Sequence, residues 1–147
     1  MGVGVGSIPA ARAQSVVTLV VTDPFTGIAI SGMDPVSYFT EPEPLLGLAD
    51  YEYIWNNVTW RFATAANRAV FASAPEIYWP QFGGHDATGI SRGFVSDSDP
   101  SIFAVFKQRL YLFYSAANRE AFLLSPDAAA RTAEEKWPEL SKNLSIN

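Results

Sequence analysis

A stretch of fourteen residues recurs 51 positions later in this chain of 147 residues. Residues Phe62–Pro75 read FATAANRAVFASAP, residues Phe113–Pro126 read FYSAANREAFLLSP, and seven of the fourteen positions are identical. Self-similarity at a fixed period is typical of one supersecondary unit used twice. The alternative is that both copies independently meet one local need: a strand, a capped alanine-rich helix and a proline stop. That need explains the cap and the proline, but it explains the shared Asn-Arg pair less well.

The residues before the first copy predict a β-hairpin. Large aromatic side chains alternate along residues Tyr51–Trp55, and large apolar side chains alternate along Val58–Phe62. Asn56-Asn57 lies between them, and Asn tolerates the positive φ that a two-residue type I′ turn needs. We therefore expect one hairpin face that carries six large apolar groups.

The hairpin is followed by helix signals. Thr64 is placed to cap a helix over residues 65–73, with Ala66, Val70 and Phe71 as the candidates for its buried face. Pro75 is placed to begin a second short helix. At the same offset of 51, Lys107-Gln108 corresponds to the turn of the first hairpin. The predicted fold class is α+β, with antiparallel hairpins packed with short helices in two pseudo-repeated hairpin–helix–helix units.

Length and composition restrict the class of protein. The chain is 48% hydrophobic with no cysteine and a net charge of −5. One domain over residues 15–140 is the simplest division. Scattered basic residues and a negative charge argue against a nucleic-acid partner. Disulfides and thiolate chemistry are excluded, and no apolar run is long enough to predict a transmembrane segment.

The two ends of the sequence differ from this domain. Residues 1–14 are rich in small residues and end in Ala11-Arg12-Ala13-Gln14. Small residues at the −3 and −1 positions are what a signal peptidase requires. We predict a signal-peptide remnant cleaved after Ala13, hence a periplasmic or secreted bacterial protein, with a flexible arm as the alternative. Residues 141–147 are predicted to be a polar tail that frays.

The stretch Pro75–Ala87 carries the residues best suited to chemistry. It holds large aromatics, a double glycine and the only histidine of the chain. An imidazole beside a carboxylate can bind a metal or act as a base, so His85 and Asp86 form a candidate metal pair. One His with carboxylates matches no common metal motif, and the alternative is a turn in which both side chains bond to the backbone. Catalytic signatures such as a Ser-His-Asp set are not recognisable, and we predict no enzymatic activity.

The aromatic residues of this region and of the hairpin allow two interpretations. They could line a ligand pocket, or they could be core. Strand spacing favours the core. The candidate surface for a ligand or a protein partner consists of Trp79, Phe82, Gly83, Gly84, His85 and Asp86.

Several blocks of the chain match a known pattern: Gly32–Phe39 reads GMDPVSYF and Trp60–Thr64 reads WRFAT. They resemble the "G-x-DPV-x-YF" opening and the "YRFAS" strand end of the YHS-domain family. Pro75–Gly84 (PEIYWPQFGG) is similar to "PEKYAPQYGG", and Leu110–Tyr114 and Trp137-Pro138 match later marks of the family. The resemblance covers about residues 28–140.

The resemblance implies an exported bacterial module, with a metal-binding, often copper-linked, role suggested for the wider group. Family members typically carry Tyr-Cys after the double glycine, where this chain has His85-Asp86. Any metal, copper or zinc, would therefore depend on these two residues. Our first expectation is a non-enzymatic exported module that binds a periplasmic protein partner or a small ligand. The alternative is a periplasmic metal-binding protein that uses His85.

Overall fold

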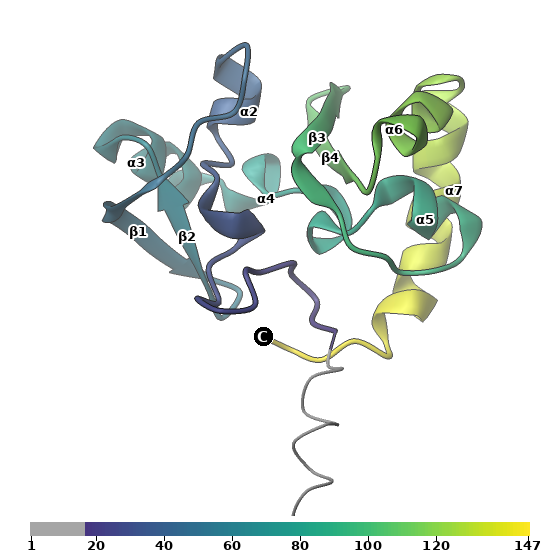
Figure 1. The fold of residues 1–147 in the computed structure, drawn as a ribbon, viewed down its shortest axis with the longest axis horizontal. Coiled ribbons are helices and arrows are strands. Elements are labelled where there is room, and N and C mark those ends of the chain that lie inside the picture. The colour runs from purple at the N-terminus through teal and green to yellow at the C-terminus, as the bar shows by residue number, and fades with distance from the viewer. Residues whose placement is uncertain (1–16) are drawn as a thin grey trace, which may run out of the picture.

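The computed structural model describes residues 17–147, and Figure 1 shows their arrangement. The elements in chain order are η1 (Ile30–Gly32), α2 (Ser37–Thr40), β1 (Leu48–Trp55), β2 (Val58–Phe62), α3 (Ala65–Ser73), α4 (Pro75–Tyr78), η2 (Gln81–Gly84), α5 (Ala87–Arg92), β3 (Asp99–Phe106), β4 (Arg109–Phe113), α6 (Ala116–Leu123) and α7 (Pro126–Ser141). The α+β fold class is confirmed, with two antiparallel two-stranded sheets in this part of the chain.

The two hairpins repeat each other in detail. β1 pairs with β2, β3 pairs with β4, and each sheet has one register shift, between Leu48 and Glu52 and between Asp99 and Phe103. Both turns have two residues with positive φ, 54° and 61° in Asn56-Asn57 and 50° and 63° in Lys107-Gln108. A type I′ turn requires positive φ at both positions. The first unit is therefore β1, β2, α3 and α4, and the second is β3, β4, α6 and α7.

The similarity also extends upstream of the hairpins. η1 and η2 each contain a run of three residues with positive φ, Ile30-Ser31-Gly32 and Phe82-Gly83-Gly84. A buried aspartate follows two positions later in each case, Asp34 and Asp86. Each repeated unit thus begins with a left-handed turn and an aspartate, which the sequence comparison did not predict.

The second helices of the two units differ most. α4 has four residues, whereas α7 has sixteen and continues through Pro138.

In α3 the buried residue is Phe71, whereas Ala66 and Val70 are exposed. The prediction of burial is confirmed for Phe71 and was wrong for Ala66 and Val70. Phe71 packs on aromatic residues of the hairpin, with its ring centroid 5.2 Å from that of Phe62.

The core has two parts, and β4 contributes to both. Leu110 and Leu112 belong to the cluster around the first unit, and Tyr111 and Phe113 belong to the cluster around the second. Successive side chains of a strand point to opposite faces, so one strand can serve two cores. The two units, side by side in Figure 1, are therefore packed against each other through the second hairpin.

Both ends of the described chain lie together below the two units (Figure 1). Leu19 N donates to Ser145 O at 2.9 Å, and Ser145 N donates to Val17 O at 2.9 Å. The Asn147 carboxamide accepts from Val20 N at 2.9 Å and donates to Val20 O at 3.0 Å. The tail predicted to fray is thus bonded to the segment 17–21. The predicted cleavage site at Ala13 lies outside the described residues.

No helix within residues 17–147 combines the length and the apolar character that a membrane crossing needs.

Candidate functional site

The residues predicted to form a ligand or partner surface are mostly buried. Phe82 is 5% exposed, His85 is 2% exposed and Asp86 is fully buried; Gly83 and Gly84 are buried as well. Only Trp79 of that set is partly exposed. The prediction of a surface at residues 82–86 was therefore wrong, because the segment 17–21 and the strand β4 cover this turn.

Asp86 connects several elements of the second unit through hydrogen bonds. Its Oδ2 atom accepts hydrogen bonds from Gly89 N at 2.9 Å, Asn118 Nδ2 at 2.8 Å and Ser96 Oγ at 3.3 Å, and its Oδ1 atom accepts one from Tyr114 N at 3.2 Å. The carboxylate thereby caps α5 and joins it to β4 and α6. All four donors are protein groups, so Asp86 has little capacity left for a ligand.

Asp34 makes the same connections in the first unit. Its Oδ2 atom accepts from Ala63 N at 2.8 Å and from Asn67 Nδ2 at 2.8 Å. Its Oδ1 atom accepts from Val36 N at 2.9 Å and from Ser37 N at 3.3 Å, at the start of α2. The repeated asparagine of the Ala-Ala-Asn-Arg block therefore serves to bind a buried aspartate.

His85 is bonded to the backbone. Its Nε2 atom lies 2.8 Å from the carbonyl oxygen of Thr18, which can only accept, so Nε2 carries the proton. Burial lowers the pKa of His85, and the carbonyl of Thr18 and the carboxylate of Asp97 oppose this shift in part. The Nδ1 atom is buried and has no hydrogen-bond partner among the described residues. The neutral side chain of His85 thus holds the segment 17–21 through its bond to Thr18.

Most of the possible ligand atoms of His85 and Asp86 are already bonded to protein groups. The oxygens of Asp86 accept four protein donors, and Nε2 of His85 is bonded to Thr18. Within residues 17–147, no three His, Cys, Asp or Glu side chains cluster closely enough to hold one. A copper or zinc site at His85 and Asp86 stays a prediction, to be checked by calorimetric titration of the chain and of His85→Gln.

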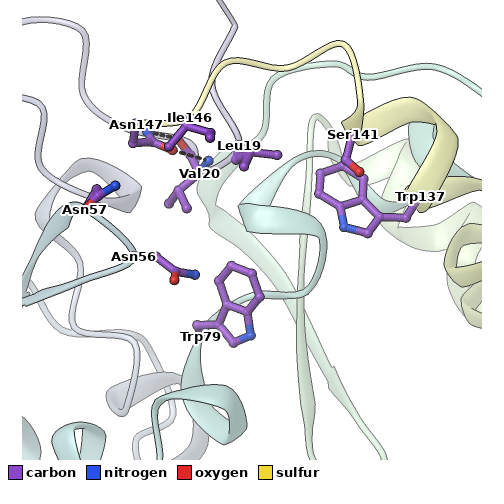
Figure 2. Close-up of a pocket in the computed structure, with 9 residues that line it drawn as sticks. All are labelled: Leu19, Val20, Asn56, Asn57, Trp79, Trp137, Ser141, Ile146 and Asn147. Atoms are coloured by element: carbon purple, nitrogen blue, oxygen red, sulfur yellow. Dashed lines mark hydrogen bonds between the residues drawn. The ribbon is translucent and has the colours of Figure 1, made fainter.

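A cavity of about 410 Å³ lies where the two units and both ends of the described chain meet. We call it the tryptophan cavity, and Figure 2 shows its lining. The lining comes from five parts of the chain: Leu19 and Val20; Asn56 and Asn57; Trp79; Trp137 and Ser141; Ile146 and Asn147. Its size is within the usual range for small-molecule sites.

Both tryptophans are held by aromatic partners. The Trp79 ring packs edge-to-face on Trp55, with 5.0 Å between ring centroids. The Trp137 ring lies 5.7 Å from Phe82 and 6.1 Å from His85 by the same measure. The buried turn at residues 82–85 thus supports the cavity from behind, and the indoles are fixed in position before any ligand arrives.

The equivalent turn of the second unit lies at a different hollow. Its residue Lys107 lines this hollow of about 310 Å³ with charged side chains. There Lys107 Nζ lies 2.6 Å from Asp127 Oδ1, and Arg109 Nη1 lies 3.3 Å from Glu134 Oε2. The tryptophan cavity therefore belongs to the junction between the units and not to either unit alone.

The sequence contained one signal for this site. Trp79-Pro80 and Trp137-Pro138 are two Trp-Pro pairs 58 positions apart, and the fold brings both tryptophans to one cavity. The contributions of residues 19–20, 56–57 and 146–147 were missed. They depend on contacts between distant segments, for which no local pattern exists.

Comparisons with known proteins give no relative: no protein-family model, no curated protein and no solved structure matches this chain.

Proposed function

We propose that this chain is a non-enzymatic binding module that holds a small molecule in the tryptophan cavity. The observation that carries the proposal is the pair Trp79 and Trp137, which come from different units and line one cavity with an aromatic partner behind each ring. Pre-positioned side chains bind more tightly because less conformational entropy is lost on binding.

The lining supports binding rather than catalysis. Its polar side chains are those of Asn56, Asn57, Ser141 and Asn147. Ser141 Oγ donates to Pro138 O at 3.2 Å, and no His, Asp, Glu or Lys of the lining is available to activate it as a nucleophile. Export to the periplasm and the likeness to YHS domains belong to the same proposal.

Proton–nitrogen NMR of the indole groups tests the proposal, because the chain has only four tryptophans. Four probes represent four ligand classes: methyl β-glucopyranoside, free indole, tetramethylammonium and succinate. We expect at least one probe to shift the Nε1–H resonances of Trp79 and Trp137 in a saturable manner. Trp60 is the internal control, since it is fully buried and its Nε1 donates to Trp55 O at 3.1 Å. Equal shifts of all four resonances, or none, would contradict the proposed function.

A further inference from the structure

Among residues 17–147, the lining of the tryptophan cavity offers no side-chain charge to a ligand. None of the nine residues that line it is Asp, Glu, Lys, Arg or His. A charged ligand would give up part of its water shell there without gaining a side-chain counter-charge, which is unfavourable. The lining therefore selects for uncharged molecules.

The polar groups of the lining are suited to hydroxyl groups. Asn56 and Asn57 are exposed at the tip of the first hairpin, so their carboxamides are open to a ligand. A carboxamide has two N–H donors and a carbonyl acceptor, and a hydroxyl group both donates and accepts. One hydroxyl can thus satisfy either end of an asparagine side chain.

Asparagine is not forced on these positions by the turn. Lys107-Gln108 adopts the same positive φ values in the second unit without any asparagine. The turn that lines the tryptophan cavity carries two carboxamides and no charge, whereas the other turn carries one carboxamide, on Gln108, and the charged Lys107.

The indoles supply a flat apolar surface beside these carboxamides. In Figure 2, Trp79 and Asn56 lie next to each other, and Trp137 lies beside Ser141. The face of an aromatic ring carries a partial negative charge and attracts the weakly positive C–H groups of a saturated ring. A pyranose has C–H groups on its faces and hydroxyls at its edge, so it can use both kinds of side chain at once.

Other uncharged or weakly hydrated ligands use only half of the lining. A purely apolar molecule would displace the water bound to Asn56 and Asn57 without forming a hydrogen bond to either side chain. A quaternary ammonium ion is attracted by indole faces, but it has no donor or acceptor for a carboxamide and brings an unpaired charge.

Resting on the proposed function, we infer that the tryptophan cavity takes an uncharged sugar ring, whose face packs on Trp79 or Trp137 and whose hydroxyls bond to Asn56 and Asn57.

The four-probe titration of the indole resonances separates this inference from the proposed function. We expect methyl β-glucopyranoside or its galacto and N-acetylglucosamine counterparts to shift Trp79 and Trp137 at lower concentration than indole, tetramethylammonium or succinate. If one of these other probes binds best, the sugar inference is overturned and the binding function stands. If no probe shifts these two resonances, both fall.

Two variants test the contacts. Trp137→Ala should weaken sugar binding about tenfold or more, the loss expected for one aromatic contact. Asn57→Gly keeps the positive φ of the turn but removes the carboxamide, and it should weaken sugar binding about fivefold. Gln108→Gly is its matched control, since it changes the equivalent position in the turn that lies away from the cavity. Sugar affinity that is unchanged in Asn57→Gly, or reduced equally in Gln108→Gly, would overturn the inference.

Discussion

The Nδ2 atom of Asn118 donates a hydrogen bond of 2.8 Å to the Oδ2 atom of Asp86, and Asn67 makes the same bond to Asp34 at 2.8 Å. Both aspartates are fully buried. Each carboxylate also accepts from backbone N–H groups at a helix start and after a hairpin strand. A single side chain in each unit thus fixes a turn, a strand end and a helix relative to one another.

Asn118→Ala should lower the free energy of unfolding by about 1–2 kcal/mol, because a buried carboxylate oxygen loses one of its donors. Asn67→Ala should have an effect of similar size, since Asp34 has the same arrangement. Urea unfolding followed by tryptophan fluorescence measures both. Arg119→Ala is the control from the same repeated block: its guanidinium lies 3.8 Å from Glu120 on the surface, and its removal should cost less than about 0.5 kcal/mol. A larger loss in the control than in Asn118→Ala would refute the role of the Asp–Asn pair.

The parts of the fold that were predicted correctly depend on neighbouring residues. The turn Asn56-Asn57 and the cap at Thr64, which accepts from Asn67 N at 3.0 Å, follow from side chains within a few positions. The same holds for the helix that begins at Pro75. Turn and cap energies are local, so a sequence pattern can indicate them.

The burial of residues 82–86 could not be predicted in this way. A double glycine next to a histidine and an aspartate is equally compatible with an exposed turn and with a covered one. Here Val21 N donates to Gly83 O at 2.8 Å, so a segment more than sixty positions away covers the turn. The tryptophan cavity also depends on contacts between distant segments, and only the two Trp-Pro pairs indicated it in the sequence. The Gly-x-Asp pattern shared by Gly32–Asp34 and Gly84–Asp86 was the overlooked sign that the repeat begins earlier.

Tyr38 should make the protein less stable at alkaline pH. Its hydroxyl donates to Pro100 O at 2.6 Å across the two units, and burial raises its pKa well above the usual value near 10. The folded state therefore keeps the proton at a pH where the unfolded chain has released it. Stability from this group is complete below about pH 10 and is lost as the pH rises toward the folded-state pKa.

Tyr38→Phe should lower the free energy of unfolding at pH 7 by about 1 kcal/mol and should weaken the fall in stability above about pH 10. Part of the fall should remain, because burial raises the pKa of Tyr111 as well. Tyr114→Phe is the control, since that side chain is 62% exposed. An alkaline profile that is identical in the wild type and in Tyr38→Phe would contradict the prediction.

His85 should produce the opposite dependence at mildly acidic pH. Burial lowers its pKa, so the unfolded chain binds a proton near pH 6.5 while the folded state stays neutral. Stability from this group is therefore complete above about pH 6.5 and decreases as the pH falls toward the folded-state pKa. The chain has one histidine, so its ring proton resonance reports the folded-state pKa without ambiguity.

His85→Gln should flatten the dependence of stability on pH between about 5 and 7, where ordinary carboxylates have already ionised. Chemical unfolding at several pH values measures it. A histidine that titrates at or above 6.5 in the folded protein would show that the side chain is open to water, contrary to its 2% exposure.

Gly83→Ala should displace the N-terminal segment and open the tryptophan cavity. Gly83 has φ +62°, and a Cβ added there would lie 1.8 Å from the carbonyl oxygen of Leu19. Leu19 lines the cavity, so its movement should reduce ligand binding as well as stability. Gly27→Ala is a matched control, because Gly27 has φ +72° but no atom within 4 Å of the added Cβ.

Both substitutions place a side chain in the left-handed region, which costs about 1–2 kcal/mol. Gly83→Ala should cost about 1–3 kcal/mol more, from the steric conflict with the segment. Amide hydrogen exchange localises the effect. Leu19 N donates to Ser145 O and Ser145 N donates to Val17 O, both at 2.9 Å, and protection of these two amides should fall in Gly83→Ala and persist in Gly27→Ala. Equal destabilisation by the two substitutions, with exchange at Leu19 unchanged, would mean that Gly83 meets only a conformational need and does not hold the segment against the cavity.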